Sequence, residues 1–224
     1  MGTDNLFHKR KAKNIKETKR RKALRKPYDK VLVVCEGAKT EPHYFHGLKD
    51  HYRLNSANIE IRSGGGADPL SIFNFAKRRF LDEKADGDRF DYVYCVFDKD
   101  IHGTYERALE EIQRATPRDT FVAINSVPCF EYWLLLHFEN TTKPYAPLPG
   151  NSACNQVLTD LRKYIPCYSK GDEDIFSQLV EKIHFAINNA RSTLKAALEA
   201  GADNPTTRVH ELVGYLQNIK RKPL

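Results

Sequence analysis

The sequence predicts an α/β fold, a mainly parallel sheet flanked by helices, with an all-helical C-terminal extension and a basic N-terminal arm. Apolar runs typical of strands buried on both faces alternate with helical patterns between residue 30 and residue 140. A proline-rich segment begins at residue 141, and only helical patterns follow it. We therefore divide the chain into an arm at 1–29, an α/β domain at 30–140 and a helical extension at 141–224.

The positive charge of the chain is concentrated in the arm. Residues 1–30 hold twelve of the 36 Lys and Arg residues but only three of the 29 acidic residues. Such a segment is expected to be disordered or loosely helical when free, and a phosphate backbone is its natural counterpart. The alternative is a solubilising tail, or one that docks on an acidic protein. The nucleic-acid contacts predicted in the arm are Lys19, Arg20, Arg21, Lys22, Arg25 and Lys26.

Composition excludes several classes of protein. No apolar run of the 224 residues reaches the length of about 18 that spans a bilayer, and the N-terminus lacks a hydrophobic signal region. We therefore expect a cytoplasmic protein without membrane contact. The five cysteines include no Cys-x-x-Cys pair, which argues against a disulfide framework or a thiolate zinc site. Cys35 and Cys95 lie in strand-like runs and are predicted to be small buried hydrophobes.

The elements of the α/β domain follow in a regular order. Asp68 and Pro69 form a helix start signal, in which a capping residue precedes a proline in the first turn. The sequence predicts strands at 30–35, 58–61, 91–97 and 120–124, and helices at 40–53, 69–83, 105–115 and 128–138. This alternation favours right-handed crossovers and a mainly parallel sheet. In the extension, helices are predicted at 154–165, 175–200 and 206–218, with a break near Asn188 and Asn189 in the long one.

Acidic residues follow two of the predicted buried strands. Glu36 ends the first strand, and Asp98 and Asp100 end the third. The carboxyl ends of parallel strands border the crevice where open α/β sheets bind ligands, so these carboxylates are expected to converge. Asp98 and Asp100 alternate along an extended chain, and a bend at the strand end is needed to bring both to one ion. Oxygen ligands of this kind suit Mg²⁺ or Mn²⁺.

Three blocks of the sequence resemble the RloB-like family, which carries a Toprim domain and is associated with abortive phage infection. The blocks are Val34-Cys35-Glu36-Gly37-Ala38-Lys39-Thr40-Glu41-Pro42-His43-Tyr44-Phe45, then Phe97-Asp98-Lys99-Asp100, then Asn125-Ser126-Val127-Pro128-Cys129-Phe130-Glu131-Tyr132-Trp133-Leu134-Leu135-Leu136-His137-Phe138. The resemblance covers most of residues 31–220. It implies a Toprim-like fold and a partner ATPase, because such proteins are commonly encoded beside one.

The resemblance also implies roles for the acidic residues. Glu36 would be the general acid or base, or a ligand in a two-metal site, while Asp98 and Asp100 would hold Mg²⁺. Glu41 resembles the acid with which Toprim nucleases bind a second ion, but it also suits a carboxylate near a helix N-terminus. Gly37 would let a phosphate approach the backbone.

Further residues are candidates on their position alone. Glu131 lies among apolar residues, where a buried charge needs a metal, a basic partner or water, and we place it at the rim of the site as a further metal ligand. Lys39 and Lys99 flank the acids, and they are either phosphate contacts or solvated surface lysines.

The expected function is that of a Mg²⁺-dependent endonuclease in antiviral defence. The expected partners are nucleic acid, either DNA or RNA, and an ATPase, since the chain shows no nucleotide-binding motif. The sequence leaves open whether the protein forms a homodimer. The alternative is a non-catalytic nucleic-acid-binding or regulatory subunit of a defence complex.

Overall fold

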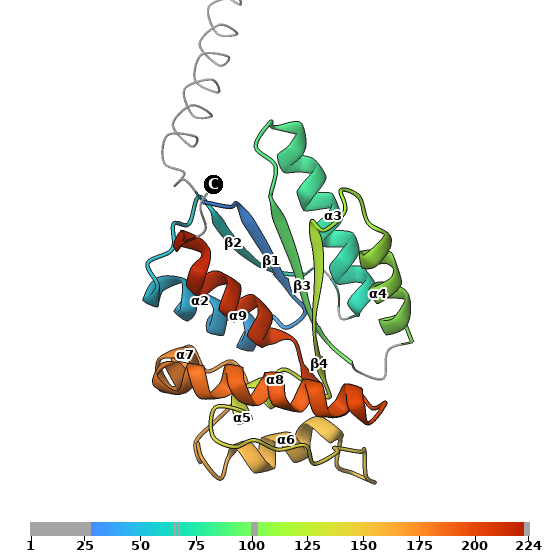
Figure 1. The fold of residues 1–224 in the computed structure, drawn as a ribbon, viewed down its shortest axis with the longest axis vertical. Helices are drawn as coiled ribbons and strands as arrows, with labels where there is room; N and C mark the ends of the chain where they lie inside the picture. The colour runs from blue at the N-terminus through green and yellow to red at the C-terminus, as the bar shows by residue number, and fades with distance from the viewer. Residues whose placement is uncertain (1–27, 65, 67, 100–102, 222–224) are drawn as a thin grey trace, which may run out of the picture.

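A five-stranded, mostly parallel sheet forms the centre of the molecule (Figure 1). The computed structural model describes residues 28–64, 66, 68–99 and 103–221. The strands lie in the order β2-β1-β3-β4-β5. β1 to β4 run parallel, while β5 pairs antiparallel with β4. The bounds are β1 Val31–Cys35, β2 Ile59–Ser63, β3 Tyr92–Asp98, β4 Phe121–Val127 and β5 Thr206–Thr207. The mixed α/β class with a mainly parallel sheet is confirmed.

Helices cover both faces of this sheet, and the alternation of side chains along β1 shows why. Val31, Val33 and Cys35 join the core beneath α2 and α9, whereas Leu32 and Val34 join the core beneath α3 and α4. Figure 1 shows α2 and α9 on one side of the sheet and α3 and α4 on the other. A strand buried on both faces has no polar side, as the unbroken apolar run predicts. The bounds are α2 Thr40–His51, α3 Pro69–Ala85, α4 Tyr105–Arg114 and α9 Val209–Asn218.

The predicted elements of the α/β domain are present with shifts of a few residues at their ends. The start of α3 is the one predicted, because Asp68 Oδ1 accepts hydrogen bonds from the backbone N–H groups of Leu70 (3.1 Å) and Ser71 (3.2 Å). Cys35 and Cys95 are fully buried, as expected of small hydrophobes. The apolar helix predicted at 128–138 is shorter, since α5 covers Glu131–Leu135 only.

The C-terminal part departs from the all-helical prediction. Thr206 and Thr207 form β5, which extends the sheet beside β4. Two residues are too few to give a period-two pattern, so the sequence did not show this strand. The long helix breaks earlier than predicted, at Val180–Lys182 between α7 (Ile175–Leu179) and α8 (Ile183–Glu199). α8 runs unbroken through Asn189, whose buried amide Nδ2 donates to Leu136 O at 2.9 Å. The remaining helix, α6, covers Ala153–Leu161.

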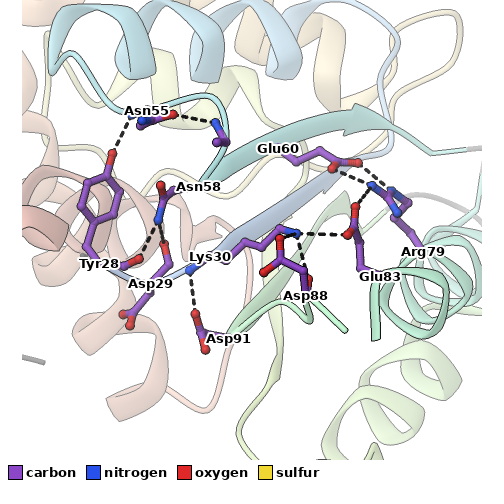
Figure 2. A network of polar contacts seen from close by, with 11 residues as sticks. Tyr28, Asp29, Lys30, Asn55, Asn58, Glu60, Arg79, Glu83, Asp88 and Asp91 are labelled. Carbon is purple, nitrogen blue, oxygen red and sulfur yellow. Dashed lines mark hydrogen bonds and ion pairs between the residues drawn. The ribbon is translucent and has the colours of Figure 1, made fainter. Parts of the chain in front are cut away.

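A network of paired charges lies at the end of the sheet where β1 begins (Figure 2). The Lys30 side chain is only 7% exposed, and its Nζ contacts Glu83 Oε2 at 3.1 Å and Asp88 Oδ2 at 2.9 Å. Arg79 pairs with Glu60 at 2.8 Å and with Glu83 at 2.5 Å. Each of these five charged side chains therefore has a partner of opposite sign.

Two sets of predicted site residues lie outside the part of the chain that the structure describes. The six arm contacts, from Lys19 to Lys26, and the candidate ligand Asp100 are not among the described residues. Within the described part of the chain, no helix has the length and apolar character needed to cross a membrane.

Candidate active site

The connections after β1 and β3 leave the sheet toward opposite faces. β1 leads into α2 on one face, and β3 leads toward α4 on the other, as Figure 1 shows. In an open α/β sheet, the crevice between two such strands is the usual place for a ligand. Glu36 is the first residue after β1 and Asp98 is the last residue of β3, so both stand at this crevice.

Glu36 and Asp98 are joined directly, although 61 residues separate them along the chain. The backbone N–H of Asp98 donates to Glu36 Oε2 at 3.0 Å. The backbone N–H of Glu36 donates to Val96 O at 2.9 Å, which continues the β1–β3 pairing one residue past the strand. The structure thus brings together the two acidic positions that the strand ends predicted.

Glu41 approaches the same point from the first turn of α2. Its side chain is almost fully buried, and Oε1 accepts a hydrogen bond from Gly37 N–H at 3.2 Å. A methyl group at residue 37 would overlap this carboxylate in its present position, so Gly37 allows the close approach of Glu41. The turn after β1 therefore positions Glu41 as well as Glu36.

Glu131 supplies a further buried carboxylate from α5. Its side chain is only 3% exposed, and Oε1 lies 3.3 Å from Lys170 Nζ. The loop that carries Lys170 is tied to α2, because Gly171 N–H donates to Thr40 Oγ1 at 3.0 Å and Gly171 O lies 3.1 Å from His43 Nδ1. Glu131 thus has the basic partner that its apolar surroundings require.

These segments enclose one cavity of about 340 Å³. The carboxylates Glu36, Glu41, Asp98 and Glu131 line it, and Lys170 stands at its rim with more than half of its side chain exposed. Backbone of the Gly37 turn and of the Lys170 loop completes the wall. The arrangement concentrates negative charge in a hollow that has a cation at its edge.

Comparison with known families identifies the chain. The family model described as RloB-like protein matches residues 31–216. The chain belongs to the RloB-like family. No curated protein and no solved structure matches it. The match begins at β1 and ends within α9, so all the segments that build the carboxylate cavity of this RloB-like protein fall inside it.

Burial and mutual repulsion govern ionisation at the cavity. Burial, followed by the charges of Glu41, Glu131 and Glu36, raises the pKa of the Asp98 carboxyl well above its usual value. Burial is also the largest influence on Glu41, and with the charges of Glu131 and Glu36 it raises the pKa of that carboxyl despite hydrogen bonds from backbone N–H groups. A divalent cation in the cavity would relieve the same repulsion.

The donor set of this RloB-like protein fits a hard cation in its chemistry. Mg²⁺ and Mn²⁺ prefer carboxylate oxygens, which line this cavity. Among the residues that the structure describes, however, no group of three or more His, Cys, Asp or Glu side chains is arranged to hold an ion. Glu36 and Glu41 accept hydrogen bonds from backbone N–H groups, and Glu131 pairs with Lys170. Binding of one ion by three of these carboxylates therefore requires their side chains to rearrange.

The two predicted lysines have different surroundings. Lys39 is exposed and lines the carboxylate cavity, within reach of a phosphate there. Lys99 points away from it, because Nζ pairs with Asp203 and lies 3.8 Å from Glu106 Oε1. Lys170 was not predicted. It lies in a loop without periodicity, and only the fold brings it beside Glu131.

Proposed function

We propose that this RloB-like protein is a Mg²⁺-dependent Toprim-type nuclease that cleaves phosphodiester bonds of nucleic acid. Its role would be anti-phage defence by abortive infection, together with an ATPase partner, as the family resemblance implies. The observation that carries the proposal is the convergence of Glu36, Glu41, Asp98 and Glu131 on one cavity at the crevice of the sheet. Burial and the neighbouring carboxylates raise the pKa of Glu41 and of Asp98, and carboxyls perturbed in this way are typical of a catalytic or metal site.

The carboxylates would divide the work between ion binding and proton transfer. Bound Mg²⁺ would stabilise negative charge on the phosphate and activate a water molecule for attack. Asp98, with Glu41, Glu131 and Asp100, would hold the cation. Glu36 would act as the general acid or base, because it lies at the open end of β1 and its Oε2 is fixed by the Asp98 N–H.

Cations at the rim would orient the substrate. Lys39 and Lys170 line the cavity from opposite segments, and both are exposed enough to reach a phosphate. A phosphate between these lysines would need a cation between itself and the carboxylates, because the two kinds of negative group repel each other. The arm adds a diffuse positive charge that would raise affinity for any nucleic acid backbone.

The test is the isosteric substitution Asp98→Asn in the full chain, assayed with and without the ATPase partner. We expect cleavage of DNA or RNA in Mg²⁺ or Mn²⁺ to fall by at least about a hundredfold, in line with the loss of one charged group from a catalytic site. Binding of the same nucleic acid, measured by fluorescence anisotropy, should remain close to wild type. Asp82→Asn, on the exposed surface of α3, is the matched control and should cleave normally.

A second candidate is a non-catalytic nucleic-acid-binding or regulatory subunit. It is favoured by the hydrogen bonds and ion pair that already occupy Glu36, Glu41 and Glu131. Under this candidate, the wild-type protein with its partner cuts neither DNA nor RNA in either metal, and Asp98→Asn changes nothing. That result would overturn the nuclease proposal.

A further inference from the structure

A second cavity, of about 520 Å³, opens beside the carboxylate cavity. It lies between the end of β4, the start of α6 and the segment before β5, and Val127, Ala153 and Asn204 line it from these three places. Its volume falls in the range of sites for small organic molecules, roughly 300–1,000 Å³. The family resemblance gives this cavity no role.

Two lysines connect this cavity to the candidate active site. Lys170 lines both cavities, and its Nζ lies 3.3 Å from Glu131 Oε1. Lys99, the residue after Asp98, lines the second cavity and pairs there with Asp203. An ammonium group has three N–H donors, so a lysine paired with one carboxylate can still bind a phosphate. A strand with its phosphate at the carboxylates would thus run past Lys170 into the second cavity.

The walls of the second cavity suit a nucleobase. Val127, Pro128, Pro147 and Ala153 provide apolar surface against which a flat ring can lie. The Asn155 side chain is exposed and forms no hydrogen bond with the described part of the chain, so its amide can pair with the polar edge of a base.

The opposite wall is held rigidly. Asn204 Nδ2 donates to Tyr145 O at 2.7 Å, and Asn204 Oδ1 accepts from Tyr145 N–H at 3.2 Å. The Tyr145 hydroxyl is anchored on Asp160 at 2.9 Å. A wall fixed on both sides is preformed, which reduces the entropic cost of ordering a ligand.

We propose that this cavity binds one unpaired nucleotide adjacent to the scissile phosphate. The substrate would then be single-stranded nucleic acid, or an unpaired end or loop, because a base that enters a walled cavity has left its pairing partner. This inference rests on the proposed nuclease function, since it takes the carboxylate cavity as the place of the scissile phosphate.

The experiment uses the full chain with Asp98→Asn as a non-cleaving background. Single-stranded oligonucleotides carry 2-aminopurine at one position at a time, since its fluorescence reports the environment of that base. We expect a fluorescence change concentrated at one position and binding at least about tenfold tighter than for a blunt duplex of the same sequence. Ala153→Phe, which fills the cavity, should abolish the position-specific signal and weaken binding of the single strand about five- to tenfold.

Control variants separate cavity filling from misfolding. Ala85→Phe places the same side chain on the exposed end of α3, on the other face of the sheet, and should bind like the background protein. Asn155→Ala removes only an exposed amide, so it should fold normally and still reduce the signal. Equal affinity for duplex and single strand, or equal signals at all positions, would overturn the inference.

The outcomes also separate the inference from the proposed function. If wild type cleaves and the signal is not localised, the nuclease proposal stands and the nucleotide cavity is wrong. If the signal is localised and lost in Ala153→Phe while wild type cuts nothing, the cavity binds a nucleotide but the nuclease proposal fails, and with it the assignment of that nucleotide to a scissile phosphate.

Discussion

The two ends of β1 carry buried charge in opposite ways. At the start, Lys30 is surrounded by Glu83 and Asp88, so a buried cation meets acids at 2.9–3.1 Å (Figure 2). At the other end, the carboxylates of Glu36, Glu41, Asp98 and Glu131 line one cavity, and burial and the other three charges raise the pKa of Asp98. At the first end each of the charged side chains named above has a partner of opposite sign, whereas at the cavity four carboxylates face one ion-paired lysine, Lys170.

The two ends differ in how their charges affect the stability of the fold. Hydrogen bonds from Arg79 and Arg62 outweigh the effect of burial and lower the pKa of the Glu60 carboxyl at the paired end. At the cavity, burial and neighbouring charges raise the pKa of Asp98. Repulsion between buried carboxylates lowers the stability of a fold until a bound ligand neutralises it. Such repulsion is found mainly at functional sites.

The largest loss of stability is expected when the buried cation Lys30 is removed. Lys30→Met should leave Glu83 and Asp88 without their cation and lower the free energy of unfolding by about 3 kcal/mol, as for other broken buried ion pairs. Arg62→Met, the control, removes an exposed partner of Glu60 and should cost less than about 1 kcal/mol. Urea denaturation measures both. Equal losses in the two variants would show that burial of the pair does not matter here.

Stability at the two ends should depend on pH with opposite sign. Unfolded Asp and Glu titrate near pH 4. The folded pKa of Glu60 is lowered, so its stabilisation is present above about pH 4 and is lost as the pH falls through the folded value. The folded pKa of Asp98 is raised, so its penalty begins as the pH rises above about 4 and is complete above the folded value.

Matched amide variants give this contrast a measurable form. At neutral pH without metal, Asp98→Asn should raise the Tm by a few degrees, at about 2–4 °C per kcal/mol for a chain of this size. Glu60→Gln should lower the Tm at the same pH, and both differences should shrink toward pH 3. A lower Tm for Asp98→Asn at neutral pH, or a Tm difference that does not change with pH, would contradict the claim that the charge on Asp98 destabilises the metal-free fold. Thermal denaturation followed by circular dichroism decides between these results.

The sequence predicted the parts of this molecule that follow from local pattern. The apolar run of β1 and the Asp68 cap both follow from a few neighbouring residues, and the structure has both. The pairing of Glu36 with Asp98 was predictable because parallel strands end at a common edge. Glu41 fell within the quoted motif, but whether it faced the cavity was not decided by spacing.

Other features depend on tertiary contacts that no local pattern encodes. β5 consists of two residues held by β4, and Lys170 reaches Glu131 only through a loop tied to α2. The long C-terminal helix was predicted to break near Asn188 and Asn189, but the buried Asn189 amide donates a hydrogen bond to Leu136 O, and the helix continues there. In each case packing against a distant segment decides the local structure.

The smallest effect on stability, and the most specific test of the cavity, comes from Gly37→Ala. The added methyl group would overlap the Glu41 carboxylate, which can swing aside because it ends a flexible side chain. The free energy of unfolding should therefore change by only about 0.5 kcal/mol. Mn²⁺ affinity, measured by isothermal titration calorimetry, should fall about tenfold, as for other disturbed metal-site residues. Gly214→Ala, where the methyl meets open space, should leave Mn²⁺ affinity unchanged.

Gly37→Ala separates the two interpretations of Glu41, as a metal ligand or as a carboxylate that complements the N-terminus of α2. If Glu41 helps to hold a cation, displacing its carboxylate must weaken Mn²⁺ binding even though the fold is intact. If Glu41 only complements the N-terminus of α2, Gly37→Ala should bind Mn²⁺ like wild type and lose only the small contribution of a carboxylate in the first helical turn, about 0.3–1 kcal/mol. Among the described acids that line the cavity, Glu36, Asp98 and Glu131 would then remain as the candidate metal ligands.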